Sequence, residues 1–152
     1  MSIVIKPSVA DFHFLFFLIV LSCCLGHCSC EIYTICPGHS IRDYGGETLI
    51  SDVGNYELGF FSPGNSTLRY VGIWPLGYAM EKKTVVWVAN RDAPISDRNG
   101  VLMIGNDGNL VVLDGNNTIV WTSNASVPLS DTAAILLRTG NFVLSNNYNM
   151  RG

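Results

Sequence analysis

After residue 46 this chain alternates apolar and polar residues with the period of a β-strand, and short turn sequences interrupt the alternation at close intervals. The alternating segments contain many β-branched and aromatic residues, which are typical of strands. We predict strands at 56–61, 70–74, 84–88, 101–104, 109–113, 118–121 and 133–137. Turn formers such as Asn99-Gly100 and Asp114-Gly115 stand between them and suit tight hairpins. The pattern therefore predicts an all-β protein.

A Gly-Asn pair followed by an apolar strand occurs three times, at Gly54-Asn55, Gly108-Asn109 and Gly140-Asn141. The second and third copies are 32 residues apart and the first two are 54 apart, so the first copy carries about 20 extra residues. A second echo, 86–90 against 120–124, has a similar spacing of 34. A period of this kind without a long helix predicts three small antiparallel sheets with pseudo-threefold symmetry, which bury their apolar faces against one another.

Strand parity separates the side chains that face this core from those that face outward. The predicted inward set is Leu102, Ile104, Leu110 and Val112 in the middle copy, Leu136, Phe142 and Leu144 in the third, and Tyr56, Leu58 and Phe60 in the first. The outward set includes Asp107, Asn109 and Val111, then Asn141 and Val143, then Val53, Asn55 and Glu57. We expect the large indoles of Trp74, Trp87 and Trp121 to fill the centre of the prism.

The first 30 residues have the three-part plan of a secretory signal peptide: Lys6, an apolar run at 12–21, and small residues ending at Cys30. The run is shorter than the roughly 20 apolar residues of a bilayer-crossing helix, although an uncleaved anchor is the alternative. We expect the mature chain to have no membrane span and to be secreted or extracellular. The predicted divisions are a signal peptide at 1–30, an N-terminal segment at 31–46, one domain at 47–146 and a tail at 147–152.

The charge composition argues against nucleic acid and anionic membranes as partners. The chain has 9 Lys and Arg against 12 Asp and Glu, for a formal net charge of −3. No basic patch or polybasic run is present in the sequence, so we expect neither nucleic acid nor an anionic membrane surface as a partner.

Cysteine and histidine positions bear on disulfides and metals. Four of the five cysteines lie in the predicted leader, which leaves Cys36 and predicts a mature fold without disulfides. Cleavage two residues earlier would leave Cys30 to pair with Cys36. A zinc site would need His27, Cys28, Cys30, Cys36 and His39, most of which leave with the leader. We expect no metal and no cofactor.

Catalytic motifs are absent from the sequence. His39 is the only histidine outside the leader, and neither a Gly-x-Ser-x-Gly elbow nor a phosphate-binding glycine loop before a helix occurs. Asn90-Arg91-Asp92 resembles part of a kinase catalytic loop, but it follows a Trp-containing strand and lacks the downstream Asn. We interpret it as a polar turn in which Arg91 and Asp92 are paired or solvated, and we predict that the chain is not an enzyme.

Several sequence blocks, in order, resemble one family. The blocks are 47–51, 56–64, 70–74, 84–91 and 107–111, with the sequences ETLIS, YELGFFSPG, YVGIW, TVVWVANR and DGNLV. They are similar to the bulb-type mannose-binding lectin domain, in the version found at the N-terminus of plant S-locus glycoproteins and S-domain receptor-like kinases. The resemblance implies a β-prism II fold, a plant source, display at the cell surface or secretion, and mannose-type glycans as partners.

The family's sugar site is the strand motif Gln-x-Asp-x-Asn-x-Val-x-Tyr, in which alternate residues share one face. On this resemblance the middle copy retains Asp107, Asn109 and Val111, with Gly105 and Leu113 in place of Gln and Tyr. The third copy retains Asn141 and Val143, and the first retains only Asn55. The resemblance thus implies a degenerate sugar site. A structural alternative is that Asp107-Gly108-Asn109 serves as a tight turn whose side chains bond local backbone.

Three N-glycosylation sequons begin at Asn65, Asn116 and Asn124, all in predicted turns or strand ends. With a secretory leader we expect at least one to carry a glycan. A glycan on Asn116 is expected to lie close to the Asp107 hairpin and to crowd its face.

Two functions of different classes fit these observations. The first is carbohydrate recognition through Asp107 and Asn109, and the second is a recognition scaffold that binds a protein, a peptide or a receptor co-chain instead of sugar. Because the sequence stops at Gly152, soon after the third copy, we expect a truncated or partial relative of this family, either part of a receptor or a free secreted fragment, with an unpaired sheet edge near its end.

Overall fold

The computed structural model describes residues 32–77, 84–125 and 132–145, which contain strands and turns and no helix. The predicted leader at 1–30 and the predicted tail at 147–152 lie outside these ranges. Within the described part of the chain, no helix has the length and apolarity needed to cross a membrane.

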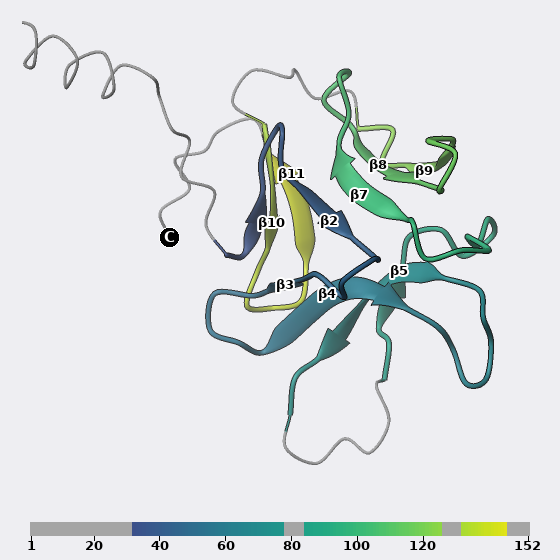
Figure 1. The fold of residues 1–152 in the computed structure, drawn as a ribbon. Coiled ribbons are helices and arrows are strands. Elements are labelled where there is room, and N and C mark those ends of the chain that lie inside the picture. The colour runs from purple at the N-terminus through teal and green to yellow at the C-terminus, as the bar shows by residue number, and fades with distance from the viewer. Residues whose placement is uncertain (1–31, 78–83, 126–131, 146–152) are drawn as a thin grey trace, which may run out of the picture.

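Eleven strands form three antiparallel sheets in the described residues (Figure 1). The first sheet has the strand order β1-β10-β11, the second β2-β7-β8-β9 and the third β3-β4-β5-β6. The strands are β1 Thr34–Ile35, β2 Ser40–Arg42, β3 Thr48–Ile50, β4 Tyr56–Phe61, β5 Tyr70–Pro75, β6 Trp87–Val88, β7 Val101–Ile104, β8 Leu110–Leu113, β9 Ile119–Thr122, β10 Ala133–Leu136 and β11 Phe142–Ser145. The prediction of three small antiparallel sheets is confirmed.

All seven predicted strands are present, and β4 and β7 have the predicted bounds. The segment predicted at 84–88 forms only the two-residue strand β6 beside β5, and the backbone N–H of Val86 adds one further hydrogen bond to the carbonyl of Ile73. Four strands lie outside the seven predicted ranges. β11 is the apolar strand that follows the third Gly-Asn pair, and β3 has only three residues. β1 and β2, of two and three residues, come from the segment at 31–46. β1 pairs with β10 through Thr34 and Ile135, and β2 pairs with β7 through Ile41 and Leu102. The N-terminal segment therefore supplies one strand to each of two sheets.

The inward faces of the three sheets meet in one aliphatic core. Leu58, Val112 and Leu136, one from each sheet, have 0% exposure. The predicted inward residues of the middle copy are all buried, and Tyr56, Phe142 and Leu144 pack against the core while partly exposed. Because β-strand alternation is a local property, parity assigned the inward faces correctly.

The three tryptophans are buried or half-buried, as core residues should be, but they do not fill the centre of the prism. Trp87 and Trp121 are half-buried and pack against the core, with their rings edge to face and centroids 5.9 Å apart. Trp74 is buried on the opposite, outer face of its sheet: it stands across from Glu57, whereas the next pair, Leu58 and Ile73, faces the core. The centre of the prism is therefore filled by aliphatic side chains.

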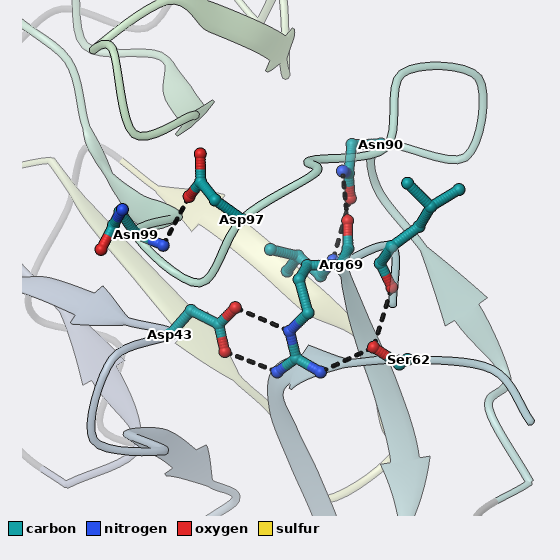
Figure 2. Close-up of polar contacts among 8 residues, drawn as sticks. Asp43, Ser62, Arg69, Asn90, Asp97 and Asn99 are labelled. Carbon is teal, nitrogen blue, oxygen red and sulfur yellow. Dashed lines mark hydrogen bonds and ion pairs between the residues drawn. The ribbon is translucent and has the colours of Figure 1, made fainter. Parts of the chain in front are cut away.

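A buried ion pair joins the link between β2 and β3 to the start of β5 (Figure 2). Arg69 donates from Nε to Asp43 Oδ2 at 2.7 Å and from Nη2 to Asp43 Oδ1, so the pairing is bidentate. The guanidinium also donates from Nη1 to Ser62 Oγ at 2.9 Å. The two side chains are 1% (Asp43) and 10% (Arg69) exposed, and the carboxylate and guanidinium satisfy each other in place of water.

Asn90 has a structural position that the sequence interpretation did not anticipate. Arg91 and Asp92 are exposed as a polar turn requires, but Asn90 is 1% exposed. Its Nδ2 donates to the carbonyl oxygen of Arg69 (Figure 2). Its Oδ1 accepts from the backbone N–H of Val71 at 2.9 Å, and its Nδ2 also donates to the carbonyl oxygen of Ala93. The side chain thus fastens the segment after β6 onto the beginning of β5.

Candidate functional site

The middle hairpin, between β7 and β8, contains the best-preserved copy of the sugar motif. Gly108 has φ of 80°, and the carboxylate of Asp107 accepts from the backbone N–H of Asn109 at 3.0 Å and from its side-chain Nδ2 at 2.8 Å. The backbone N–H of Gly105 donates to the carbonyl of Asn109 across the turn. Asp107 and Asn109 therefore build the tight turn that the structural alternative described.

The side-chain oxygen of Asn109 is used within the fold. It accepts from Ser123 Oγ at 3.2 Å and from the backbone N–H of Ala125 at 2.6 Å, which engages both of its lone pairs. Val111, expected on the same outward face, is only 4% exposed. Asp107 is exposed, and its two oxygens can each accept a further hydrogen bond. Of the three motif residues in this copy, Asp107 alone presents its functional group to solvent.

Hydrogen bonds from the Asn109 side chain and backbone hold the pKa of Asp107 below its ordinary value of 3.8. A lowered pKa means that the stabilisation is present above pH 3.8 and is lost as the pH falls through the lower folded-state value. We predict that an NMR titration of the Asp107 carboxyl gives a pKa below 3.8, and that Asn109→Ala returns it toward that value. An unchanged pKa in the variant would contradict the assigned cause.

The third hairpin presents its motif residues more openly. Asn141 and Val143 are exposed and line a groove of about 690 Å³ between this hairpin and the sheet of β4, β5 and β6. Tyr56 and Trp87 line the opposite side. Gly140 has φ of 82°, and a Cβ there would lie 2.8 Å from the ring of Tyr56, so glycine permits the close approach of hairpin and ring. The groove combines an exposed amide with aromatic faces.

The face of the first copy is filled by the protein itself. Trp74 donates from Nε1 to Glu57 Oε2 at 2.7 Å, and its indole lies over Gly59, where an added Cβ would be 3.4 Å from the ring. Glu57 stands where the motif has Val, and Asn55 is exposed at the end of this face. The indole therefore occupies the outward surface on which this copy would hold a sugar.

Residues 84–151 match the model of the D-mannose binding lectin family. Two G-type lectin S-receptor-like serine/threonine-protein kinases of Arabidopsis thaliana, one of them B120, are 48% and 50% identical over 113 and 117 residues. Each match covers 74% of this chain and 13% of the relative. Residues 84–151 therefore belong to a bulb-type lectin domain.

The fold of the lectin domain is that of the solved bulb-type lectins. A mannose-specific lectin from Dutch crocus, Crocus vernus, superposes with a TM-score of 0.57, covering 76% of this chain and 89% of the crocus chain at 16% identity. The predicted β-prism II fold is thereby confirmed. The lectin domain spans about an eighth of the length of its curated relatives, and the matches fall on their lectin part. The relatives' kinase activity is thus not assigned to the residues described.

The three sequon asparagines of the lectin domain are exposed. The expected neighbourhood of Asn116 and the Asp107 hairpin is wrong, because Asn116 lies in the turn between β8 and β9, at the other end of β8. Four strand residues put about 13 Å between the two turns. Asn124 is the sequon residue near Asn109, since it adjoins Ala125, which bonds Asn109 directly.

The residues that could bind a metal or form a disulfide are few in the described part of the lectin domain. No cluster of three His, Cys, Asp or Glu occurs in the described ranges. Cys36 is 1% exposed beside Thr34, with its Sγ 3.9 Å from Thr34 Oγ1. The other predicted ligands of a zinc site, apart from the exposed His39, lie outside the described residues.

Proposed function

We propose that this lectin domain is a secreted or cell-surface carbohydrate-recognition domain that binds mannose-type glycans through a degenerate site. The observation that carries the proposal is the groove at the third hairpin, where Asn141 and Val143 face Tyr56 and Trp87. The match to the D-mannose binding lectin family and the mannose specificity of the crocus lectin support this ligand class. The predicted leader and the receptor-kinase relatives support an extracellular location.

The chemistry of the groove suits a hexose. An aromatic ring offers a flat apolar surface to the C–H face of a sugar, and an exposed amide can both donate to and accept from adjacent hydroxyls. The side chain of Asn141 has no hydrogen bond within the described ranges, so it is available to a ligand. In the middle hairpin, Asp107 can accept from a hydroxyl, whereas the oxygen of Asn109 is engaged. We therefore place the principal sugar contact at Asn141 and a weaker one at Asp107.

A shallow site with so few hydrogen bonds is expected to bind a monosaccharide weakly, with a dissociation constant near 1 mM, equivalent to about −4 kcal/mol. The test is a glycan array on the folded protein, followed by titration with an oligomannose glycan. Asn141→Ala should weaken binding by about tenfold, which corresponds to one lost hydrogen bond of about 1.4 kcal/mol. Asp107→Ala should cause a smaller loss.

Asn106→Ala is the matched control, because Asn106 is an exposed amide in the turn of the middle hairpin at a variable position of the motif. It should leave binding unchanged. An array without mannose-type ligands, recorded on protein whose fold is verified by circular dichroism, would overturn the proposal. Binding that survives both Asn141→Ala and Asp107→Ala would retain the function and reject these residues.

The second candidate function is a recognition scaffold for a protein, a peptide or a receptor co-chain. Trp74 on the outward face of the first copy and the engaged oxygen of Asn109 favour it, because both reduce the number of places open to sugar. Crosslinking to a protein partner at the cell surface that free mannose does not compete would support this candidate. Complete competition by mannose would reject it.

A further inference from the structure

A second groove, of about 750 Å³, lies at the outer end of the sheet formed by β3 to β6. Phe61 and Tyr70 stand opposite each other on β4 and β5 and pair their rings with centroids 5.8 Å apart. They share the face that carries Trp74. The rings of Phe61 and Trp74 pack edge to face, with their centroids 6.2 Å apart. This aromatic groove is completed by Ser62, Pro63, Gly64, Val85, Val88 and Arg91. None of these lining residues belongs to a copy of the sugar motif, and the groove lies on the outer face of β4 and β5 beyond the indole of Trp74.

The polar side chains of the aromatic groove are few, and the charged one among them is the cation Arg91; the others are the hydroxyls of Ser62 and Tyr70. Ser62 Oγ donates to the carbonyl of Leu68 at 2.8 Å and accepts from Arg69, so it is engaged. Arg91 is exposed and has no ion pair in the described part of the chain, unlike Arg69 and Arg138. None of the lining residues is acidic; Asp92 follows Arg91 in the chain but does not line the groove. A guanidinium beside apolar rings selects a carboxylate attached to an apolar body.

The size and position of the aromatic groove favour a peptide over a small acid. Its volume is in the upper part of the range of ligand pockets, and a single small carboxylic acid would fill only a fraction of it. Val88 belongs to β6, which is the outermost strand of its sheet, and an outermost strand can pair with an extended backbone. A hexose fits less well, because it brings no negative charge to the Arg91 guanidinium and because the engaged Ser62 hydroxyl has no proton left to donate and a single lone pair left to accept.

We propose that the aromatic groove binds an extended peptide segment of a partner protein in which an aromatic or branched aliphatic residue stands next to an acidic residue. The apolar side chain packs on Phe61 and Tyr70, and the carboxylate pairs with Arg91. This site is independent of sugar binding at Asn141, and it gives the second candidate function a ligand class.

The test titrates three synthetic peptides into the purified protein and measures binding by NMR or calorimetry. The peptides are acetyl-Gly-Phe-Asp-Gly-amide, the analogue with Asn in place of Asp, and the analogue with Ala in place of Phe. The Phe-Asp peptide should bind about tenfold more tightly than either analogue, because each analogue lacks one of the two contacts. Arg91→Gln should remove the preference for Asp over Asn. Arg98→Gln is the matched control, since Arg98 is an exposed arginine outside the groove, and it should leave the preference intact.

Two further probes decide the occupant. Binding of 3-phenylpropionate as tight as that of the Phe-Asp peptide would overturn the peptide assignment in favour of a small acid. Displacement of the peptide by methyl α-mannoside would show that the groove is part of the sugar site and would also overturn the proposal. Equal affinity for the three peptides, or no binding of any of them to folded protein, would also overturn the proposal. Sugar binding on the glycan array is unaffected by any of these results, so the two proposals fail separately.

Discussion

Replacing Arg69 with methionine is expected to lower the free energy of unfolding by about 3–5 kcal/mol, the usual cost of removing one partner from a buried ion pair. The variant leaves the carboxylate of Asp43, 1% exposed, without its counter-charge in a site that water reaches poorly. It also removes the donor to Ser62 Oγ and so loosens the contact between the ends of β4 and β5. Denaturant unfolding followed by tryptophan fluorescence measures the loss.

Two controls separate charge burial from general damage. Arg138→Met removes an exposed ion pair with Asp52, whose side chains are 63% and 53% exposed and 3.8 Å apart, and should change stability by less than about 0.5 kcal/mol. The double variant Asp43→Leu/Arg69→Met should recover much of the loss, because no buried charge remains. A single variant as stable as the native chain would contradict the buried pairing, and a double variant worse than the single would show that packing dominates.

The sheets were predictable from sequence because the signals that define them are local. Alternation over four to six residues identified β4, β7 and β8, and it also assigned Leu58, Val112 and Leu136 to the core. β1 and β2 were missed because two or three residues cannot show a period. Their pairing, as between Thr34 and Ile135, joins positions about 100 residues apart.

Trp74 shows what parity alone could not decide. The inward face of β4 was assigned, but the register of β5 against β4 was unknown, so the side of Trp74 stayed open. Gly59 and Gly72 contained a signal, since they pair across the two strands and leave the outer face bare beside the indole. Because glycine has no side chain, a pair of glycines on the outer face leaves space in which a neighbouring tryptophan ring can be buried outside the central core.

The candidate site was only partly predictable for the same reason. The turn role of Asp107 and Asn109 is local and could be anticipated. The hydrogen bond from the Ala125 N–H to Asn109 Oδ1 could not, because Ala125 lies beyond the next strand, β9, and its bond occupies an acceptor that a sugar would need. Proximity in sequence also misplaced Asn116, because β8 separates it from the Asp107 hairpin. Phe61, Tyr70 and Arg91 come from three separate segments, and no sequence motif joins them.

Replacing Asn90 with alanine is expected to cost about 2 kcal/mol, because it leaves the buried N–H of Val71 without an acceptor. The carbonyl of Arg69 keeps its bond from the N–H of Ile95, so the orphaned donor at Val71 is the main penalty. Unfolding in denaturant measures the cost, and amide hydrogen exchange locates it: the Val71 N–H should exchange faster than that of the native chain.

Asn106→Ala is the control here as well, since that side chain is exposed and should change stability by less than about 0.5 kcal/mol. If Val71 exchange is unchanged in Asn90→Ala, the assigned hydrogen bond is not the source of the stabilisation. The result also bears on recognition. Asn90 immediately precedes Arg91, so loss of its three backbone contacts should free the guanidinium to move and weaken the aromatic groove's preference for an acidic peptide, while sugar binding at Asn141 stays the same.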